Sequence, residues 1–389
     1  MHRVPALPIT FFRRTVGSLF TVLAAGLFTA LPAEDGGHNG NGMKPMPPVQ
    51  VGGGPAATPG GPASAPNAGA STTPAGTPDA NGLTIFPFKT AGGRPQAICV
   101  GPDGNLWVTE VIKHQIVKVT PTGEVTEFPV PEKNCGVLQG IAAGPDGQIW
   151  FTSREENAIR TISVAGKFGA SFEIPSAVAD YIGKTATKSS WPREIAPGPD
   201  GNLWFAEKAT DKIAKIDKTG KIVEYALPNP KSEPYCIVTG PDKKIWYTAW
   251  GEAKVGCFDP ATEKFAEYDA PAGCREVTVG PDGNLWYTGD KGNKIGKMTL
   301  TGQVTEYPVP TANAGLVGIT AGSDGAVWFC EIKGGKVGRC TLDGKITEIA
   351  VPVNNPQPFC LTTGPDKNIW VALQANAVMR VAVTPAAKP

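Results

Sequence analysis

The sequence predicts an all-β protein, namely a seven-bladed β-propeller of four-stranded antiparallel blades in which the N-terminal strand completes the last blade. Three observations support this prediction. The stretch GPDGNLW occurs at Gly101, Gly198 and Gly280, related turns recur between and after these copies, and no segment of the repeats has the periodicity of an amphipathic helix. A catalytic motif normally occurs once, whereas a structural unit is repeated. The repeat is therefore evidence about the fold before it is evidence about the function.

Each copy of the turn is followed by a tryptophan six residues after its first glycine. Successive turns are 43, 54, 42, 40, 42 and 42 residues apart, so seven units fill nearly all of residues 83–385. The turns begin at Gly101, Gly144, Gly198, Gly240, Gly280, Gly322 and Gly364. The tryptophans are Trp107, Trp150, Trp204, Trp246, Trp286, Trp328 and Trp370.

Each unit divides into four short strands, as the fifth unit illustrates. Its apolar side chains alternate or cluster in four segments separated by turn residues, namely residues 274–280, 285–289, 293–300 and 303–310. In the GPDG turn, proline presets its own φ, aspartate accepts local backbone hydrogen bonds, and the last glycine takes a positive φ. Gly256, Gly296 and Gly338 of the third strands are expected to leave room for a large neighbour such as tryptophan.

The two ends of the repeat region predict how the ring closes. The seventh unit stops after its third strand, at residues 377–383, and the missing fourth strand is present at residues 83–89. Between the second and third units, residues 177–190 add about a dozen residues, for which we expect a surface loop that acts as a lid or contacts a partner.

The N-terminal 82 residues indicate an exported protein. Residues 1–33 have basic residues before a short apolar run, which predicts a signal peptide or, alternatively, a retained N-terminal anchor. Residues 34–82 are rich in Pro, Gly and Ala and predict a disordered linker, followed by the propeller at 83–385 and a tail at 386–389. The expected location is the periplasm, the cell surface or the medium, with no integral membrane domain beyond that possible anchor.

Charge and cysteine content narrow the range of functions. The chain has 36 basic and 35 acidic residues, which removes any electrostatic argument for nucleic acid as a partner. Eight cysteines in an exported chain permit disulfides, and Cys330 with Cys340 or Cys236 with Cys274 are two candidate pairs. The alternative is that most cysteines are small buried apolar residues.

Residues 198–228 resemble the repeat of the streptogramin B lyases, also called virginiamycin B lyases. That family consists of seven-bladed propellers that open a cyclic depsipeptide at its ester bond by elimination, with Mg²⁺ as cofactor. The resemblance implies a histidine base and metal-binding glutamates in the last two blades. The matching positions here are Val317 and Phe359 for the histidines and Gln357 and Leu373 for the glutamates. No catalytic residue is therefore assigned, and no cofactor is expected unless the lyase activity is retained, which would require Mg²⁺.

The channel mouth offers the candidate binding residues. The second position of each inner strand and the position three residues after each tryptophan are polar in several of blades one to six, and two arginines among them suit an anionic ligand. The candidates are Gln96, Glu110, Gln139, Arg193, Glu207, Tyr235, Arg275 and Glu331. In the alternative interpretation, these charges pair with one another between blades and close the channel with water. Trp250 and Trp191 lie outside the repeated position, and Trp250 is a candidate contact for a sugar or a partner, although core packing is also open.

Three classes of function follow from these residues. The first is a monomeric exported binding module with a small-molecule or protein ligand at the channel mouth. The second is a metal-dependent lyase or a hydrolase similar to gluconolactonase-type propellers, using Glu110, Glu207 and Glu331 in place of the family's residues. The third is a structural protein of the cell envelope. Because the turn aspartates recur in every blade, we assign them to the turn and not to calcium.

Overall fold

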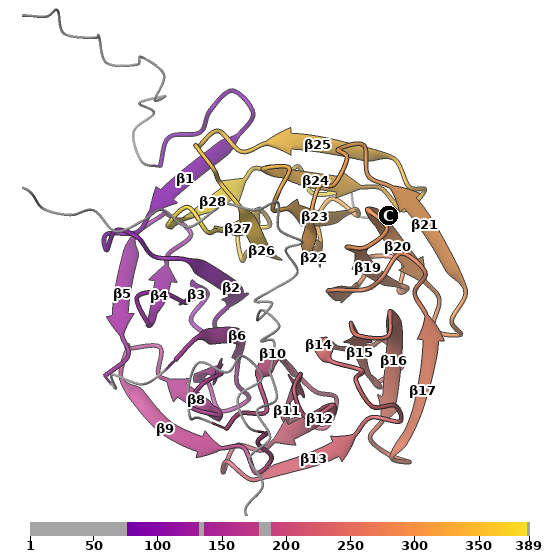
Figure 1. Ribbon diagram of the computed structural model, residues 1–389. Coiled ribbons are helices and arrows are strands. Elements are labelled where there is room, and N and C mark those ends of the chain that lie inside the picture. The colour runs from indigo at the N-terminus through magenta and orange to yellow at the C-terminus, as the bar shows by residue number, and fades with distance from the viewer. Residues whose placement is uncertain (1–75, 132–135, 179–187, 387–389) are drawn as a thin grey trace, which may run out of the picture. The chain divides into compact units, whose positions relative to one another are not determined.

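The computed structural model describes residues 76–131, 136–178 and 188–386, and all its regular elements are β-strands. They form seven four-stranded antiparallel sheets arranged as blades around a ring (Figure 1), which confirms the predicted propeller. No helix in the described ranges is long and apolar enough to cross a membrane. The expectations for residues 1–75, Cys135 and most of the 177–190 insertion concern residues outside the described ranges.

The strands have five or six residues each, except β18, which has three. The innermost strands are β2 (Pro95–Val100), β6 (Leu138–Ala143), β10 (Pro192–Pro197), β14 (Pro234–Thr239), β18 (Val277–Val279), β22 (Leu316–Ala321) and β26 (Pro358–Thr363). The second strands, which carry the repeated tryptophans, are β3 (Leu106–Glu110), β7 (Ile149–Ser153), β11 (Leu203–Glu207), β15 (Ile245–Ala249), β19 (Leu285–Gly289), β23 (Val327–Glu331) and β27 (Ile369–Leu373).

The two outer positions complete each blade. The third strands are β4 (Gln115–Val119), β8 (Ala158–Ile162), β12 (Lys212–Ile216), β16 (Lys254–Asp259), β20 (Lys294–Met298), β24 (Lys336–Cys340) and β28 (Ala377–Val381). The outermost strands are β5 (Val125–Pro129), β9 (Phe168–Glu173), β13 (Ile222–Ala226), β17 (Lys264–Asp269), β21 (Val304–Pro308), β25 (Ile346–Ala350) and, in the seventh blade, β1 (Leu83–Pro87).

The ring is closed by its first strand, as the sequence predicts. β1 pairs antiparallel with β28, with Leu83 opposite Val381 and Pro87 opposite Ala377. Figure 1 shows the indigo β1 beside the yellow β28. Phe86 of β1 then packs with Trp370 and Leu106, which joins the seventh blade to the first. Because one blade contains strands from both ends of the repeat region, opening the ring requires breaking a complete strand pairing.

The repeated turn is held by its own tryptophan. In all seven blades the indole Nε1 donates a hydrogen bond to Oδ1 of the turn aspartate, over 2.9–3.1 Å. A Cβ at Gly101 would come within 2.5 Å of the Trp107 ring, so the first glycine makes space for the indole. Gly, Asp and Trp are therefore one structural unit, in which the aspartate serves the indole as well as the backbone.

Seven apolar clusters hold the blades together, each with residues from neighbouring blades. One example combines Trp107 of the first blade with Leu138 and Phe151 of the second, and all three are fully buried. Side chains of this size contribute about 2–3 kcal/mol each on burial. The tryptophan is thus a contact between blades, as expected.

The third-strand glycines accommodate a different ring from the one expected. A Cβ on Gly256, Gly296 or Gly338 would lie 2.0–2.2 Å from a ring carbon of Tyr247, Tyr287 or Phe329. The large neighbour is thus the aromatic residue that follows the repeated tryptophan, because it points to the opposite face of its strand.

The two proposed disulfides are absent, and the seven described cysteines are free. Cys330 lies opposite Val337 and Cys340 opposite Val327, so the two thiols are at opposite ends of one hairpin, about 10 Å apart along the strand direction. A disulfide requires Cα atoms closer than about 7 Å. Cys236 and Cys274 instead donate to backbone oxygens, those of Val277 and of Lys254. Five of the seven described cysteines are buried, so most of them behave as small apolar residues.

Candidate functional site

The polar residues predicted at the channel mouth form a chain of contacts from blade to blade. Gln96 Nε2 donates to Gln139 Oε1 over 3.4 Å, and Arg193 Nη1 donates to the same oxygen over 3.0 Å. Each of these residues is the second residue of an inner strand, so the starts of neighbouring inner strands come close together around the axis. Gln374 Nε2, from the seventh blade, donates to Gln96 Oε1 over 3.4 Å and extends the chain.

Two arginines flank one tyrosine in the continuation of this chain. The Cζ atoms of Arg193 and Arg275 lie 4.7 Å and 5.2 Å from the ring centroid of Tyr235. Arg275 Nη2 also donates to the Tyr235 hydroxyl over 3.2 Å. We call Gln96, Gln139, Arg193, Tyr235 and Arg275 the polar arc. It places two guanidinium groups close to one aromatic ring, a geometry stabilised by attraction between the cations and the ring.

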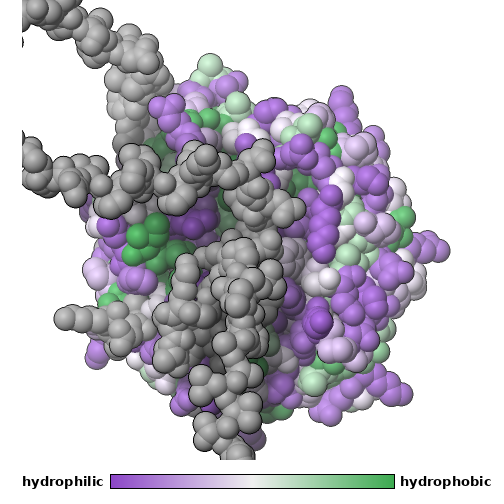
Figure 2. Space-filling view, viewed as in Figure 1, coloured by the Kyte–Doolittle hydropathy of each residue, from purple (hydrophilic) through white to green (hydrophobic). Residues whose placement is uncertain are grey.

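The sixth and seventh blades complete the mouth with apolar side chains. Val317, Phe359 and Leu373 are buried in one cluster together with Cys330 and Leu361. Arg275 Cζ lies 5.5 Å from the Phe359 ring, so the polar arc meets this apolar sector at that contact. Figure 2 shows that hydrophilic residues predominate on the visible face over blades four and five.

The four positions that the resemblance assigns to the histidines and to the metal-binding glutamates do not suit a cation. Val317, Phe359 and Leu373 present no ligand atom, which leaves the amide of Gln357 as the single polar side chain of the four. In the described ranges, no three His, Cys, Asp or Glu residues are grouped so that they could hold a metal ion. Mg²⁺ requires several oxygen ligands, so the four positions do not fit it.

The three candidate glutamates lie in separate blades, and Glu110 and Glu207 have local hydrogen-bond partners. Glu110 accepts hydrogen bonds from the backbone N–H groups of Arg94, Ile112 and Lys113 and so fixes the loops of blade one. Glu207 accepts one from the Thr210 hydroxyl over 2.8 Å in blade three. The structure therefore brings the polar arc together and leaves Glu110, Glu207 and Glu331 in separate blades.

Burial changes the acidity of two of these carboxyl groups. Burial, followed by the neighbouring Glu224, raises the pKa of Glu207 to about 8, although Thr210 and Lys212 oppose the shift. Burial and Glu348 raise the pKa of Glu331 to about 7. Both groups favour the protonated form far more than an exposed glutamate does.

Two further carboxyl groups lie next to the arginines of the polar arc. Burial raises the pKa of Glu194 to about 7, while Arg193 opposes the shift. Burial and Glu194 raise the pKa of Glu276 to about 8, with Arg275 opposing. Since these acids retain protons near neutral pH, they compensate the arginine charges only in part.

The next position along the chain carries functional groups that, apart from Trp250, were not predicted from the sequence. The residue after each second strand includes Arg154, Lys208, Trp250, Asp290 and Gln374. Lys208 Nζ lies 4.5 Å from the centre of the Trp250 ring, and Trp250 Nε1 donates to Asp290 over 2.9 Å. Side chains alternate in direction along a strand, so the residues at this position point away from the side that the preceding residues face. This alternation is the sequence signal from which the position could have been predicted.

These observations define the protein as a seven-bladed propeller with a half-polar, half-apolar channel mouth. The chain belongs to the Virginiamycin B lyase family, whose model matches residues 77–191 and 184–388. The resemblance inferred from the repeat is thereby confirmed. The chain is 30% identical to the virginiamycin B lyase of Nocardia farcinica over 170 residues, which are 44% of this chain and 54% of that protein. The match thus spans about half the length of that curated relative.

Solved structures of the same family have the same fold. A streptogramin B lyase is 31% identical with a TM-score of 0.71, and 78% of this chain covers 97% of that chain. The virginiamycin B lyase of Staphylococcus aureus is 29% identical with a TM-score of 0.70, covering 78% of this chain and 99% of that one. A catalytically inactive form of that enzyme, solved with quinupristin, has the same identity, coverage and TM-score.

Proposed function

We propose that this protein is an exported binding module that takes a carboxylate-bearing small molecule at the channel mouth. Arg193 and Arg275 would hold the carboxylate, Tyr235 would separate and orient them, and the apolar sector beside Phe359 would cover the body of the ligand. The observation that carries the proposal is the pair of guanidinium groups on one tyrosine ring. Arginine is suited to this task because its planar fork matches a carboxylate.

Two properties of the neighbourhood support an anionic ligand. The buried Nε of Arg275 has no hydrogen-bond partner among the described residues. Burial lowers the pKa of Lys208 to about 8, and Arg193 and Arg275 contribute to that shift. The positive potential of the two arginines therefore reaches a neighbouring side chain, and an anion at the mouth would lower the energy of all three cations.

A lyase or hydrolase is the alternative, and the geometry supports it less. Ester elimination requires a base that reaches the substrate proton, and the metal requires several oxygen ligands. The apolar sector offers neither, and Glu110, Glu207 and Glu331 lie in different blades. We therefore expect no Mg²⁺-dependent linearisation of a streptogramin B antibiotic by the purified protein, measured by mass spectrometry. Turnover that is lost in Glu207→Ala but kept in the arginine variants would overturn the binding proposal.

The binding experiment compares two probes that differ only in charge. N-Acetylphenylalanine carries the carboxylate, and N-acetylphenylalaninamide lacks it. By calorimetry we expect the acid to bind at least about tenfold more tightly, a difference of about 1.4 kcal/mol. The double variant Arg193→Ala/Arg275→Ala should lose that preference, whereas Arg339→Ala, whose side chain pairs with Asp324 in blade six, should keep it. Equal affinities in the wild-type protein, or no binding of either probe, would contradict the proposal.

A further inference from the structure

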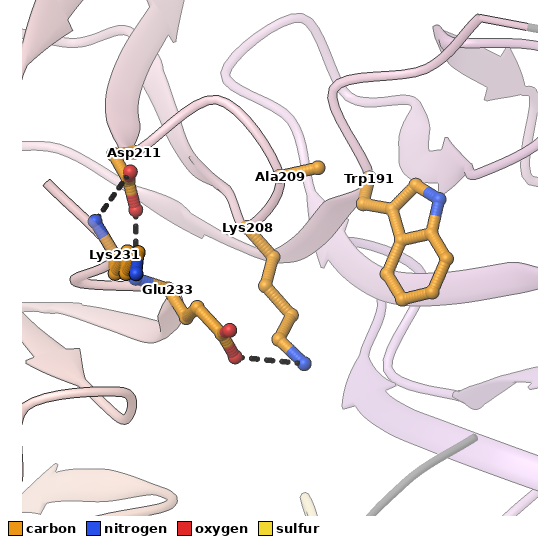
Figure 3. Close-up of a pocket in the computed structure, with 6 residues that line it drawn as sticks. All are labelled: Trp191, Lys208, Ala209, Asp211, Lys231 and Glu233. Carbon is orange, nitrogen blue, oxygen red and sulfur yellow. Dashed lines mark hydrogen bonds and ion pairs between the residues drawn. The ribbon is translucent and has the colours of Figure 1, made fainter. Parts of the chain in front are cut away.

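A pocket of about 110 Å³ lies beside the polar arc, with a lysine at its centre. Its lining residues come from blade three and from the segment that leads to blade four (Figure 3), and they are Trp191, Lys208, Ala209, Asp211, Lys231 and Glu233. Asp211 accepts backbone hydrogen bonds from Lys231 and Glu233, over 2.7 Å and 2.9 Å, which fixes one wall. The pocket is therefore a formed feature of the chain and does not involve the sector aligned with the family's catalytic residues.

Lys208 is held between aromatic rings and one carboxylate. Its Nζ lies 4.5 Å from the Trp250 ring centre, 5.8 Å from that of Trp191 and 3.2 Å from Glu233 Oε2. Only 10% of the lysine side chain is exposed. Figure 3 shows the side chain extending between Trp191 and Glu233 with its amine at the open side. The amine thus has a fixed position next to an acid–base group.

The indole that forms one wall is held in a costly backbone conformation. Trp191 has φ of 55°, in the left-handed region that bulky residues rarely adopt. Such a conformation costs about 1–3 kcal/mol and persists only where the surroundings impose it. Trp191 is also buried, with Arg193 Cζ 5.9 Å from its ring centre. Glu233 and Gln357 also have a positive φ immediately before an inner strand, so this loop conformation recurs between blades and here places the indole beside the lysine.

The charge state of Lys208 differs from that of a surface lysine. Burial is the largest cause of its lowered pKa of about 8, Arg193 adds to it, and Glu233 opposes it. At pH 7.4 roughly a fifth of the amine would be neutral, against about 0.1% for an ordinary lysine. Only the neutral amine is a nucleophile, and desolvated lysines of this kind form Schiff bases with carbonyl compounds.

We infer that Lys208 captures a small α-oxo carboxylate as an imine in this pocket. The neutral Nζ attacks the carbonyl carbon, a C–N bond forms, and the C=O electron pair moves to oxygen, which takes a proton. Glu233 carries that proton from the nitrogen to the oxygen; as the C–O bond then breaks, it accepts the second nitrogen proton and passes it to the departing oxygen, which leaves as water. The net change is amine plus carbonyl to imine plus water, so no oxidant or reductant is needed.

Size and charge select the ligand class. An engineered protein cavity of about 150 Å³ holds benzene, so a pocket of 110 Å³ suits about four to six non-hydrogen atoms. Arg193 lies against the same indole as Lys208 and would receive the carboxylate. The choice of an acid rests on the proposed function of the polar arc, whereas formation of the imine does not.

The test is reductive trapping followed by peptide mapping. The full chain is incubated with glyoxylate and sodium cyanoborohydride, and modified lysines are quantified by mass spectrometry. Lys215 is the matched control inside the same protein, since its Nζ lies 5.5 Å from the Trp204 ring and 3.7 Å from Asp200 but outside the pocket. We expect Lys208 to be modified at least about tenfold faster than Lys215, and the variant Lys208→Arg to lose that product alone.

The outcomes separate the two proposals. Modification of Lys208 no faster than that of Lys215 would overturn the inference, whatever ligand the arginines bind. Fast modification of Lys208 by glyoxylate, reduced severalfold in Arg193→Ala, would support both the imine and the role of the arginine. If Lys208 reacts fast while calorimetry detects no preference for the carboxylate probe at the polar arc, the imine is supported and the proposed function alone fails. The comparison with Lys215 needs no variant and so does not depend on how Lys208→Arg folds.

Discussion

The two halves of the channel mouth use the same strand positions, but one half carries polar side chains there and the other carries apolar ones. In blades one to five these positions carry amides, two arginines and a tyrosine joined by hydrogen bonds and cation–ring contacts. In blades six and seven they carry Val317 and Phe359, which are buried in a cluster with Leu373. The blade scaffold of this chain thus accepts either polar or apolar residues near the start of its inner strands.

The largest expected effect comes from placing a charge in the apolar sector. Leu373→Glu puts a carboxylate into a fully buried site without a partner. We expect a loss of about 3–5 kcal/mol in the free energy of unfolding, measured by urea denaturation. The matched change in the other half is Gln139→Glu, which would face Arg193 at the position where the amide now accepts its hydrogen bond, and should change stability by less than about 1 kcal/mol. Equal losses in the two variants would show that the halves do not differ in polarity as described.

A smaller effect is expected on how the stability of the protein depends on pH. The pKa of Glu207 is raised to about 8 in the folded protein by burial and by Glu224, above its ordinary value of 4.5. The folded state therefore binds a proton that the unfolded state releases, and stability falls as pH rises from about 5 towards 8. Glu207→Gln should flatten this slope, by on the order of 1 kcal/mol per pH unit. The measurement is urea denaturation at several pH values, and an unchanged slope would exclude Glu207 as its source.

The smallest effect is expected at the tyrosine of the polar arc. Tyr235→Phe removes the hydroxyl that accepts from Arg275 but keeps the ring beside both guanidinium groups. We expect a change of about 0.5–1.5 kcal/mol in stability and a severalfold loss of affinity for the carboxylate probe. Tyr235→Leu, which removes the ring as well, should lose more of both. If the two variants behave alike, the cation–ring contacts contribute nothing measurable.

The sequence by itself determined the architecture. Seven turns with a tryptophan at constant spacing predicted seven blades, and the missing last strand predicted closure by residues 83–89, because repeats reveal units that must stack on copies of themselves. The inner-strand residues that meet at the mouth were also predictable, since they occupy one repeated position. The hydrogen bonds between the indoles and the aspartates were not predictable, because the backbone hydrogen bonds of the turn are enough to explain an aspartate at that position.

Only the tertiary structure decided which side chains meet across blades. Tyr235 is about 40 residues from Arg193 and from Arg275 in the sequence, and the stacking of the three depends on the radius of the ring and the rotamers that fit it. Lys208 and Trp250 share one repeated position whose residue differs from blade to blade, Trp191 has no counterpart of its kind, and folding brings the three side chains together beside one pocket. Local sequence fixes strands and turns through backbone preferences and alternation, whereas contacts between blades depend on packing that no single repeat contains.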